Sequence, residues 1–286
     1  MKTPNRIVPL VEDGIVDRVI RQLMSGKEAT VYIVQCGDEI RCAKVYKEVN
    51  QRSFHQAVNY TEGRREKNSR KARAMEKGTR FGRKEQEAAW QNTEVDALYK
   101  LGAAGVRVPR AYGFYEGVLL MELLTDADGA PAPRLNDLEL SEQQARAFHA
   151  MLIKQVVLML CAGVVHGDLS EFNILVDSDG PVIIDLPQAV DAAANNNASR
   201  ILGRDVANLA NYFGQFAPDL LTTQYGKEIW ALYQSGELTP DTPLTGHVAS
   251  DGRIADVRAV MQEITAANDD HAAKLRYQQL KREEGR

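Results

Sequence analysis

The stretch HGDLSEFNIL, from His166 to Leu175, places a carboxylate and a carboxamide five residues apart. It follows the apolar run VLMLCAGVV and precedes a second aliphatic segment, so Asp168 and Asn173 are expected on one short loop between buried elements. Phosphoryl transfer needs a carboxylate that orients the attacking hydroxyl and oxygen ligands that hold a metal ion. The spacing Asp-x-x-x-x-Asn therefore indicates a phosphoryl-transfer loop in which Asp168 accepts the proton and Asn173 binds Mg²⁺.

Three further residues complete this chemistry when they are taken in chain order. Asp185 ends the aliphatic stretch PVIID twelve residues after Asn173 and supplies a second oxygen ligand of the kind that Mg²⁺ prefers. Lys44 is a charged residue in the otherwise apolar pattern CAKVY, where it can present a cation to phosphates in a cleft between lobes. Glu94, on a later helix, is the acidic residue best placed to pair with it. A single Asp-x-x-x-x-Asn match is a weak signal, but the ordered set predicts a kinase-like site.

The apolar pattern predicts a strand-rich first part. ATVYIVQC and IRCAKVYK, separated by Gly-Asp-Glu, indicate a β-hairpin, and the chain is expected to start with strands. EQEAAWQNTEVDALYKLGAAG predicts one helix that stops at Gly102 and Gly105. VLLMELL predicts a buried strand that leads into TDADGAPAPRL, a connector between lobes.

The second part is predicted to be mainly helical. Ser141 and Gln144 form a capping-box signature before ARAFHAMLIKQVVLMLCAG, a long helix. ILVDSDGPVIID predicts two short strands around an Asp-Gly turn, and DVANLANYFGQF and TQYGKEIWALY predict two more helices. The predicted fold class is therefore α+β, with a β-rich N-lobe (1–123, including the Glu94 helix), a helical C-lobe (124–235), and a linker with a C-terminal helical extension (236–286).

Composition and charge narrow the class of protein. The longest apolar run, Val156 to Val165, is about half of the roughly 20 residues that cross a bilayer. The N-terminus does not resemble a signal peptide, and three cysteines without metal-ligand spacing fit a reduced compartment, so a cytoplasmic protein is expected. The net charge is −4, but residues 64–84 hold ten Lys or Arg against two Glu. This basic segment is either a solvated loop or a surface for ribosomal RNA phosphates, and charge alone does not choose between them.

Seven segments together resemble the signatures of the RIO family of atypical protein kinases, over roughly residues 20–235: SGKEATVYIV, CAKVYK, LLMELL, APAPRL, HGDLSEFNILV, IIDLPQAV and RDVANLANYF. The resemblance implies a reduced two-lobed protein-kinase fold, ATP with Mg²⁺ or Mn²⁺, and phosphorylation of serine, including autophosphorylation. It also implies work on maturing small ribosomal subunits. The branch without an N-terminal winged helix is expected, because only about 20 residues precede the matched motifs.

Matched motif by motif, the resemblance implies nucleotide contacts from three segments. They are Ser25, Gly26 and Lys27 in a short loop over the phosphates, Lys44 against the phosphates, and Glu122 and Leu124, whose backbone would bind the adenine edge. The family pattern also implies Asp168 as catalytic base, Lys44 paired with Glu94, and Asn173 and Asp185 as metal ligands. In some members the metal aspartate is discussed as a phosphoaspartate site in an ATPase cycle, which makes Asp185 a candidate for covalent chemistry.

Two departures from ordinary protein kinases leave other functions open. Ser170 stands where such kinases carry a lysine that contacts the γ-phosphate, and no Ala-Pro-Glu segment is present to build a peptide platform. Besides a serine/threonine protein kinase, the sequence is compatible with a small-molecule phosphotransferase and with an ATP-gated binding module acting on ribosomal particles.

Overall fold

The computed structural model describes residues 3–26, 28–47 and 80–248. Lys27, most of the basic segment and the predicted C-terminal helix lie outside these residues. In the described ranges the first part of the chain forms an antiparallel five-stranded sheet with the order β1-β2-β3-β5-β4. The strands are β1 (Arg18–Ser25), β2 (Ala29–Cys36), β3 (Glu39–Tyr46), β4 (Ala111–Tyr115) and β5 (Val118–Glu122).

The predicted hairpin is confirmed, since β2 and β3 pair from Cys36 opposite Glu39 to Ala29 opposite Tyr46. The expectation that the chain starts with strands is wrong, because the short helix α1 (Val8–Glu12) comes first. The sequence reasoning also missed β1, in which only Val19 is buried, so the strand carries no alternating apolar signal.

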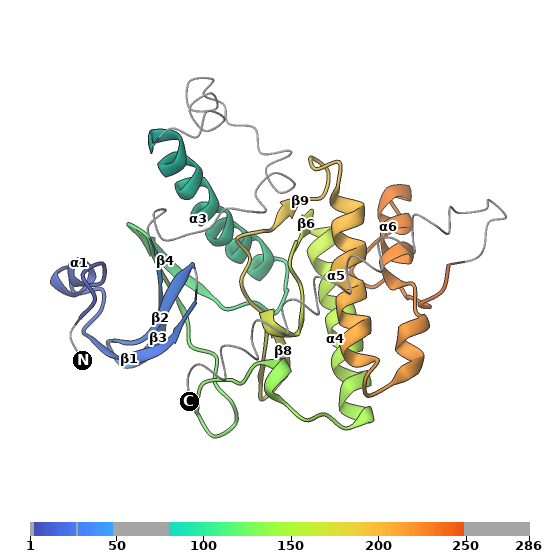
Figure 1. Ribbon diagram of the computed structural model, residues 1–286, viewed down its shortest axis with the longest axis horizontal. Coiled ribbons are helices and arrows are strands. Elements are labelled where there is room, and N and C mark those ends of the chain that lie inside the picture. The colour runs from blue at the N-terminus through green and yellow to red at the C-terminus, as the bar shows by residue number, and fades with distance from the viewer. Residues whose placement is uncertain (1–2, 27, 48–79, 249–286) are drawn as a thin grey trace.

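The two faces of the sheet have different partners, which fixes where Lys44 lies. Ala43 and Leu120 belong to a core cluster with Ile7 and Leu10 from the α1 region. Because side chains alternate along a strand, Lys44 lies on the opposite face from Ala43. Figure 1 shows α1 beyond the sheet on the side away from the helical lobe, so the face that carries Lys44 is turned toward that lobe.

Helix α3 (Arg80–Ala103) joins the sheet to the main core. Glu94, Leu98 and Leu101 are spaced by four and three residues and therefore share one helical face. Leu98 and Leu101 are buried in the core. The same spacing carries Glu94 inward, where it is 2% exposed.

The second lobe is built on three helices, α4 (Glu142–Cys161), α5 (Ala198–Phe213) and α6 (Tyr225–Ser235). The capping box is confirmed, since Ser141 Oγ accepts the Gln144 N–H and the Gln144 side chain accepts the Ser141 N–H. The predicted strand pair after the loop is β7 (Ile174–Asp177) with β8 (Gly180–Ile183). Two short strands, β6 (Val164–Val165) and β9 (Val190–Asp191), and the 3₁₀ turns η2 (Leu135–Asp137), η3 (Glu171–Asn173) and η4 (Pro218–Thr222) complete the described elements.

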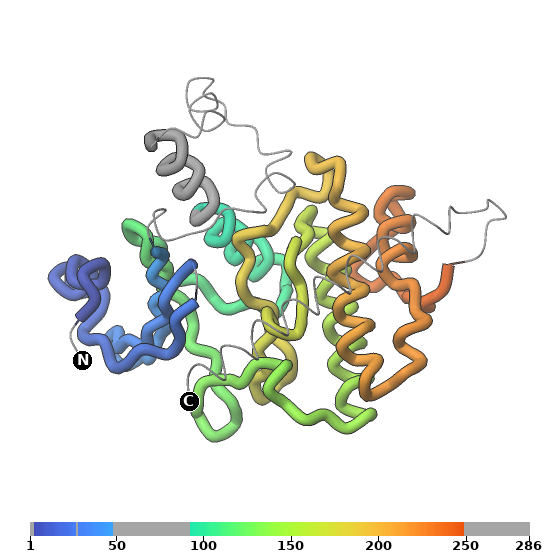
Figure 2. Tube along the Cα trace, viewed as in Figure 1, coloured from blue at the N-terminus to red at the C-terminus, as the bar shows by residue number. Residues whose placement is uncertain are grey.

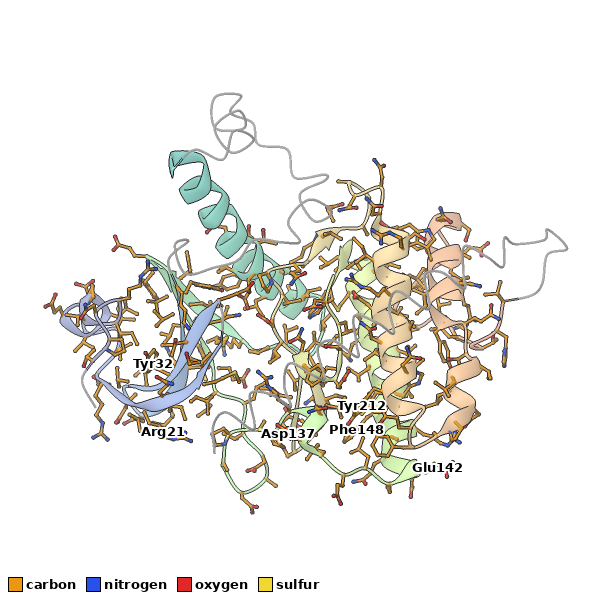
Figure 3. The ribbon with its side chains drawn as sticks, in the orientation of Figure 1. Arg21, Tyr32, Asp137, Glu142, Phe148 and Tyr212 are labelled. Carbon is orange, nitrogen blue, oxygen red and sulfur yellow. The ribbon has the colours of Figure 1, made fainter. Side chains whose placement is uncertain are left out.

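The connector leaves the sheet at Glu122 and enters the helical lobe at Leu135. In Figure 2 its trace runs from the sheet past the lower end of the molecule to the start of α4. Tyr212 of α5 donates a hydrogen bond to the carbonyl of Leu135 at 2.8 Å, and Figure 3 shows Tyr212 near Asp137 at this end of the lobe. The α+β two-lobed architecture is thus confirmed, whereas the division at residues 123 and 235 stays a prediction. No helix in the described ranges is both long and apolar enough to span a bilayer.

His149 gives the helical lobe a pH-dependent stability. It is 3% exposed on α4, packs against the rings of Phe213 and Tyr225, and its Nε2 has no hydrogen-bond partner among the described residues. Burial lowers the pKa of His149 from 6.5 to about 4. As pH drops, the His149 side chain takes up its proton in the unfolded chain before it does so in the folded one. The free energy of unfolding of wild type, relative to that of His149→Phe, should therefore fall by up to about 3 kcal/mol from pH 6.5 to 4. Urea denaturation of both proteins across this pH range tests the prediction, and a difference that does not change with pH would contradict it.

Candidate active site

A buried ion-pair cluster joins the two lobes. Lys44 Nζ of β3 donates to both carboxylate oxygens of Glu94, at 2.6 and 2.9 Å, and to Asp185 Oδ1 at 2.8 Å. Lys44 and Glu94 are 9% and 2% exposed, while the Asp185 side chain is 41% exposed. The lysine therefore lies between a fixed internal carboxylate and one that solvent and ligands can reach.

Tyr46 adds a second donor to Glu94. It lies two residues after Lys44 on the same face of β3, is 1% exposed, and its hydroxyl donates to Glu94 Oε2. Buried carboxylates need such donors, because an ionised group loses its hydration on burial. Sequence reasoning missed Tyr46, although its position two residues from Lys44 was the available signal.

Opposite charges set the protonation of this cluster. Burial alone would lower the pKa of Lys44, but the carboxylates of Asp185 and Glu94 outweigh it and hold the pKa well above its usual value. Burial alone would raise the pKa of Asp185, but the Lys44 ammonium holds it below its usual value. Burial raises the pKa of the Tyr46 phenol well above its usual value, and the Glu94 carboxylate raises it further. Lys44 is thus a cation, Asp185 an anion and Tyr46 a neutral donor at neutral pH.

The loop from His166 to Asn173 lies beside this cluster. Asn173 Nδ2 donates to the main-chain oxygen of Asp168 at 2.8 Å and lies 3.4 Å from its Oδ2. His166 Nδ1 accepts the Asp168 N–H at 3.2 Å, which leaves Nε2 as the donor to the Ile184 carbonyl at 3.1 Å. The Ile184 N–H in turn donates to the Asn173 carbonyl at 3.0 Å. His166 therefore bonds the loop backbone through both ring nitrogens.

Helix α5 braces the peptide groups on both sides of Asp168. Asp205 Oδ2 accepts the Gly167 N–H at 2.8 Å, and Oδ1 accepts the Leu169 N–H at 3.2 Å. From the same helix, Arg204 donates to the Gly167 carbonyl and Asn208 Nδ2 donates to the Leu169 carbonyl at 3.0 Å. Gly167 and Leu169, on either side of Asp168, are therefore held by four hydrogen bonds to one stretch of helix.

Asn173 and Asp185 fit a divalent cation. Asn173 Nδ2 is bound to Asp168, so its Oδ1 stays available, and Asp185 Oδ2 makes no hydrogen bond among the described residues. These are hard oxygen donors of the kind that Mg²⁺ uses together with water and substrate phosphates. Asp185 has φ 66°, a left-handed conformation that costs a non-glycine residue energy and is often found at functional sites. No group of three or more His, Cys, Asp or Glu that could form a metal site occurs in the described residues.

Apart from Lys44, the described residues that were predicted to bind the nucleotide lie in the loop after β1 and around the end of β5. Gly26 forms the turn between β1 and β2, where its N–H donates to the Ala29 carbonyl at 2.9 Å. Lys47 Nζ donates to the Gly26 carbonyl at 2.6 Å and lies 3.4 Å from Ser25 Oγ. These contacts hold the loop to the end of β3, three residues beyond Lys44.

At the connector, the Leu124 carbonyl accepts the Ala132 N–H at 2.9 Å. The Leu124 N–H finds no acceptor within residues 3–26, 28–47 and 80–248. A backbone donor without a partner on a buried residue is available to a ligand such as the adenine edge. Glu122 ends β5 two residues earlier, and its carboxylate accepts the Arg110 N–H at 3.0 Å.

Comparison with known proteins shows the family to which these residues point. A family model described as the RIO domain matches residues 30–225. RIO-type serine/threonine-protein kinase Rio1 of Haloferax volcanii is 34% identical over 214 residues, which are 74% of this chain and 69% of that protein. The chain belongs to the RIO family. The Rio1 kinase of Methanocaldococcus jannaschii is 32% identical over 191 residues (66% and 60% of the two chains), and human serine/threonine-protein kinase RIO1 is 29% identical over 213 residues (74% and 36%). The chain thus spans about a third of the human relative's length.

The RIO assignment confirms the family predicted from the motifs, and the relatives' names support a serine/threonine protein kinase. The structure pairs Lys44 with Glu94, the partner expected from the sequence, and bonds Asn173 to Asp168. It also pairs Lys44 with Asp185, a contact that the sequence reasoning did not predict. Besides Tyr46, sequence reasoning assigned no role to Arg204, Asp205 and Asn208. The available signal was the position of Asp205 on an otherwise apolar helical face with Ile201, Leu202 and Val206.

Asp205 makes a testable contribution to stability. Burial raises its pKa from 3.8 to about 6, against the opposing effect of His166 and Arg204. A carboxyl whose folded pKa is raised stabilises the fold below its unfolded pKa and loses that contribution as pH rises through the folded pKa. Stability relative to Asp205→Asn should therefore fall by up to about 3 kcal/mol between pH 4 and 7 in urea titrations. Asp219→Asn is the control, because Arg146 lowers the pKa of that exposed carboxyl. The same change of unfolding free energy with pH in both variants would contradict a raised pKa for Asp205.

Proposed function

We propose that this RIO-family kinase binds ATP with Mg²⁺ between its lobes and transfers the γ-phosphoryl group to serine or threonine. The observation that carries the proposal is the Lys44 ammonium held between Glu94 and Asp185, beside a loop that fixes Asp168 against Asn173. Mn²⁺ offers the same charge and accepts the same oxygen donors.

Each side chain has a distinct role in this proposal. Lys44, held by Glu94, orients the phosphates, while Ser25, Gly26 and Lys27 cover them and the backbone of Glu122 and Leu124 positions adenine. Bound Mg²⁺ would neutralise phosphate charge in the transition state. Asn173 and Asp185 hold it, and Asp168 accepts the proton of the attacking hydroxyl.

Binding would exchange one of the two partners of Lys44. Its ammonium is shared between Glu94 and Asp185. Asp185 would hold the metal ion, which would leave Lys44, still paired with Glu94, to contact the phosphates. Tyr46 would remain a second donor to the buried Glu94 carboxylate.

The test is incubation of the wild-type, Asp168→Ala and Asp185→Ala proteins with γ-labelled ATP and Mg²⁺, following free phosphate and protein-bound label. We expect acid-stable label on serine or threonine, including autophosphorylation, that is lost in both variants. Phosphate release without stable label, lost in Asp185→Ala, would favour an ATPase switch that uses Asp185 covalently or gates binding. Binding of ATP with no turnover would instead point to a small-molecule acceptor or a binding module.

A ribosomal partner is a separate proposal that rests on the charge of residues 64–84, of which 64–79 lie outside the described residues. Binding to ribosomal RNA should weaken steeply with salt, because phosphate contacts release counterions. Replacing Arg70, Lys71 and Arg73 by Gln should reduce the slope of log affinity against log salt by about 2 to 3. Filter binding between low and moderate salt measures it, and an unchanged slope would remove this segment from the interface.

A further inference from the structure

Arg134 lies where the connector meets the catalytic lobe, and its backbone is held on both sides. It forms an isolated antiparallel bridge with Leu175, two residues after Asn173, and the Val176 N–H donates to the neighbouring Pro133 carbonyl at 2.9 Å. On its other side, Leu135 starts η2 and is fully buried. The position of the Arg134 side chain is thus set by the same strand that follows the catalytic loop.

From this position the side chain reaches the opposite lobe. Arg134 Nη2 lies 3.0 Å from the sulfur of Met24 in β1, one residue before Ser25 and two before Gly26. Arg134 is also close enough to Asp185 for its positive charge to act on that carboxylate. The guanidinium therefore lies against the strand that leads into the nucleotide loop, within electrostatic range of Asp185.

Within the described residues, the charge of Arg134 is poorly satisfied. A thioether is a weak acceptor, and a guanidinium offers five donors. In the part of the chain that the structure describes, Arg134 has no carboxylate within ion-pair distance, whereas Arg107 pairs with Asp177 and Arg146 with Glu142 and Asp219. A half-buried arginine that meets the opposite lobe without a carboxylate partner among the described residues is arranged to receive an anion from outside the chain.

We infer that Arg134 binds a phosphate group of the nucleotide, exchanging its contact with Met24 for bidentate hydrogen bonds to phosphate oxygens. The inference rests on the proposed function, since the nucleotide is the phosphate-bearing ligand expected between Ser25 and Asp185. Arginine suits this task because its planar fork matches phosphate geometry. The exchange is favoured because a neutral sulfur acceptor is replaced by a charged oxygen acceptor.

The predicted effect is on affinity for phosphate-bearing ligands alone. Hydrogen bonds to charged groups contribute about 1.5–3 kcal/mol, so Arg134→Met should weaken MgATP binding by roughly 10- to 150-fold. Adenosine lacks the phosphates, so its affinity should change by less than about twofold. Arg134→Lys keeps the positive charge but loses the planar guanidinium that can bond two phosphate oxygens at once. Its loss of MgATP affinity should therefore be intermediate.

The experiment is calorimetric titration of the full chain with adenosine, MgADP and MgATP, using wild type, Arg134→Met, Arg134→Lys and Arg18→Met. Arg18 is the matched control, because it lies at the far end of β1 and bonds Gln35. Thermal melting of each variant confirms that it is folded. Phosphate-dependent loss in Arg134→Met, with Arg18→Met unchanged, supports the inference.

Two results would overturn the assignment of Arg134. Equal losses for adenosine and MgATP would show that the side chain only shapes the binding site, and unchanged affinity for every ligand would show that it does not contact the nucleotide. Wild-type binding of MgATP is measured first. Its absence would overturn the proposed function together with this inference, whereas wild-type binding with either result above overturns the Arg134 contact alone.

Discussion

Lys44→Met is expected to lower the free energy of unfolding by about 3–5 kcal/mol, because it leaves the Glu94 carboxylate buried without its cation. Tyr46 would remain as a donor to Glu94, but a neutral hydroxyl does not compensate the charge. The double variant Lys44→Met/Glu94→Gln removes the uncompensated charge and should recover most of this loss. Urea denaturation of the two single variants and the double variant measures the coupling.

Measurements of activity distinguish the contribution of the Lys44–Glu94 pair to stability from its contribution to catalysis. The double variant should regain stability but stay at least about 100-fold less active than wild type, because no cation meets the phosphates. Arg41→Met is the control, since it breaks an ion pair with a largely exposed Glu39 and should cost less than about 1 kcal/mol. Equal losses of stability in the single and double variants would show that the pair does not act as a unit.

Asp168→Asn is expected to slow phosphoryl transfer by about 10²- to 10⁴-fold while leaving MgATP affinity nearly unchanged. The carboxylate is the expected base, but Asn173 bonds the main-chain oxygen of residue 168, and Gly167 and Leu169 are held by Asp205. The loop should therefore keep its shape in the variant. Single-turnover kinetics with labelled ATP measure the chemical step apart from binding.

The control for this variant is Asp179→Asn, in the exposed turn between β7 and β8. It changes the same charge at a position without a proposed catalytic role and should transfer phosphate at the wild-type rate. A rate loss below about tenfold in Asp168→Asn would argue against general-base catalysis by this residue.

The parts of the site that could be predicted are those with local signals. Asp168 and Asn173 lie five residues apart, and Lys44 interrupts an apolar strand, so spacing and alternation were enough to select them. Glu94 lies 50 residues from Lys44 and was selected by its order on the expected helix, and α3 does carry it to Lys44.

The parts that could not be predicted depend on contacts between distant elements. Arg134 meets Met24 across 110 residues, and Asp205 reaches the Gly167 peptide across 38, distances over which a sequence pattern carries no pairing information. Strands β6 and β9 have two residues each and exist only because they pair with one another. Asp185 shows the same limit: it was expected at the end of a strand, but β8 ends at Ile183 and the aspartate lies beyond it in a left-handed conformation.

The most direct test of the MgATP site is the ATP affinity of wild type, Asn173→Ala and Asp185→Asn, each with and without Mg²⁺. Asn tolerates the left-handed conformation at residue 185, so Asp185→Asn changes the charge and leaves the backbone in place. We expect Mg²⁺ to strengthen ATP binding to wild type and this gain to be lost in both variants. The same gain in all three proteins would contradict it, because the metal would then be bound without Asn173 and Asp185.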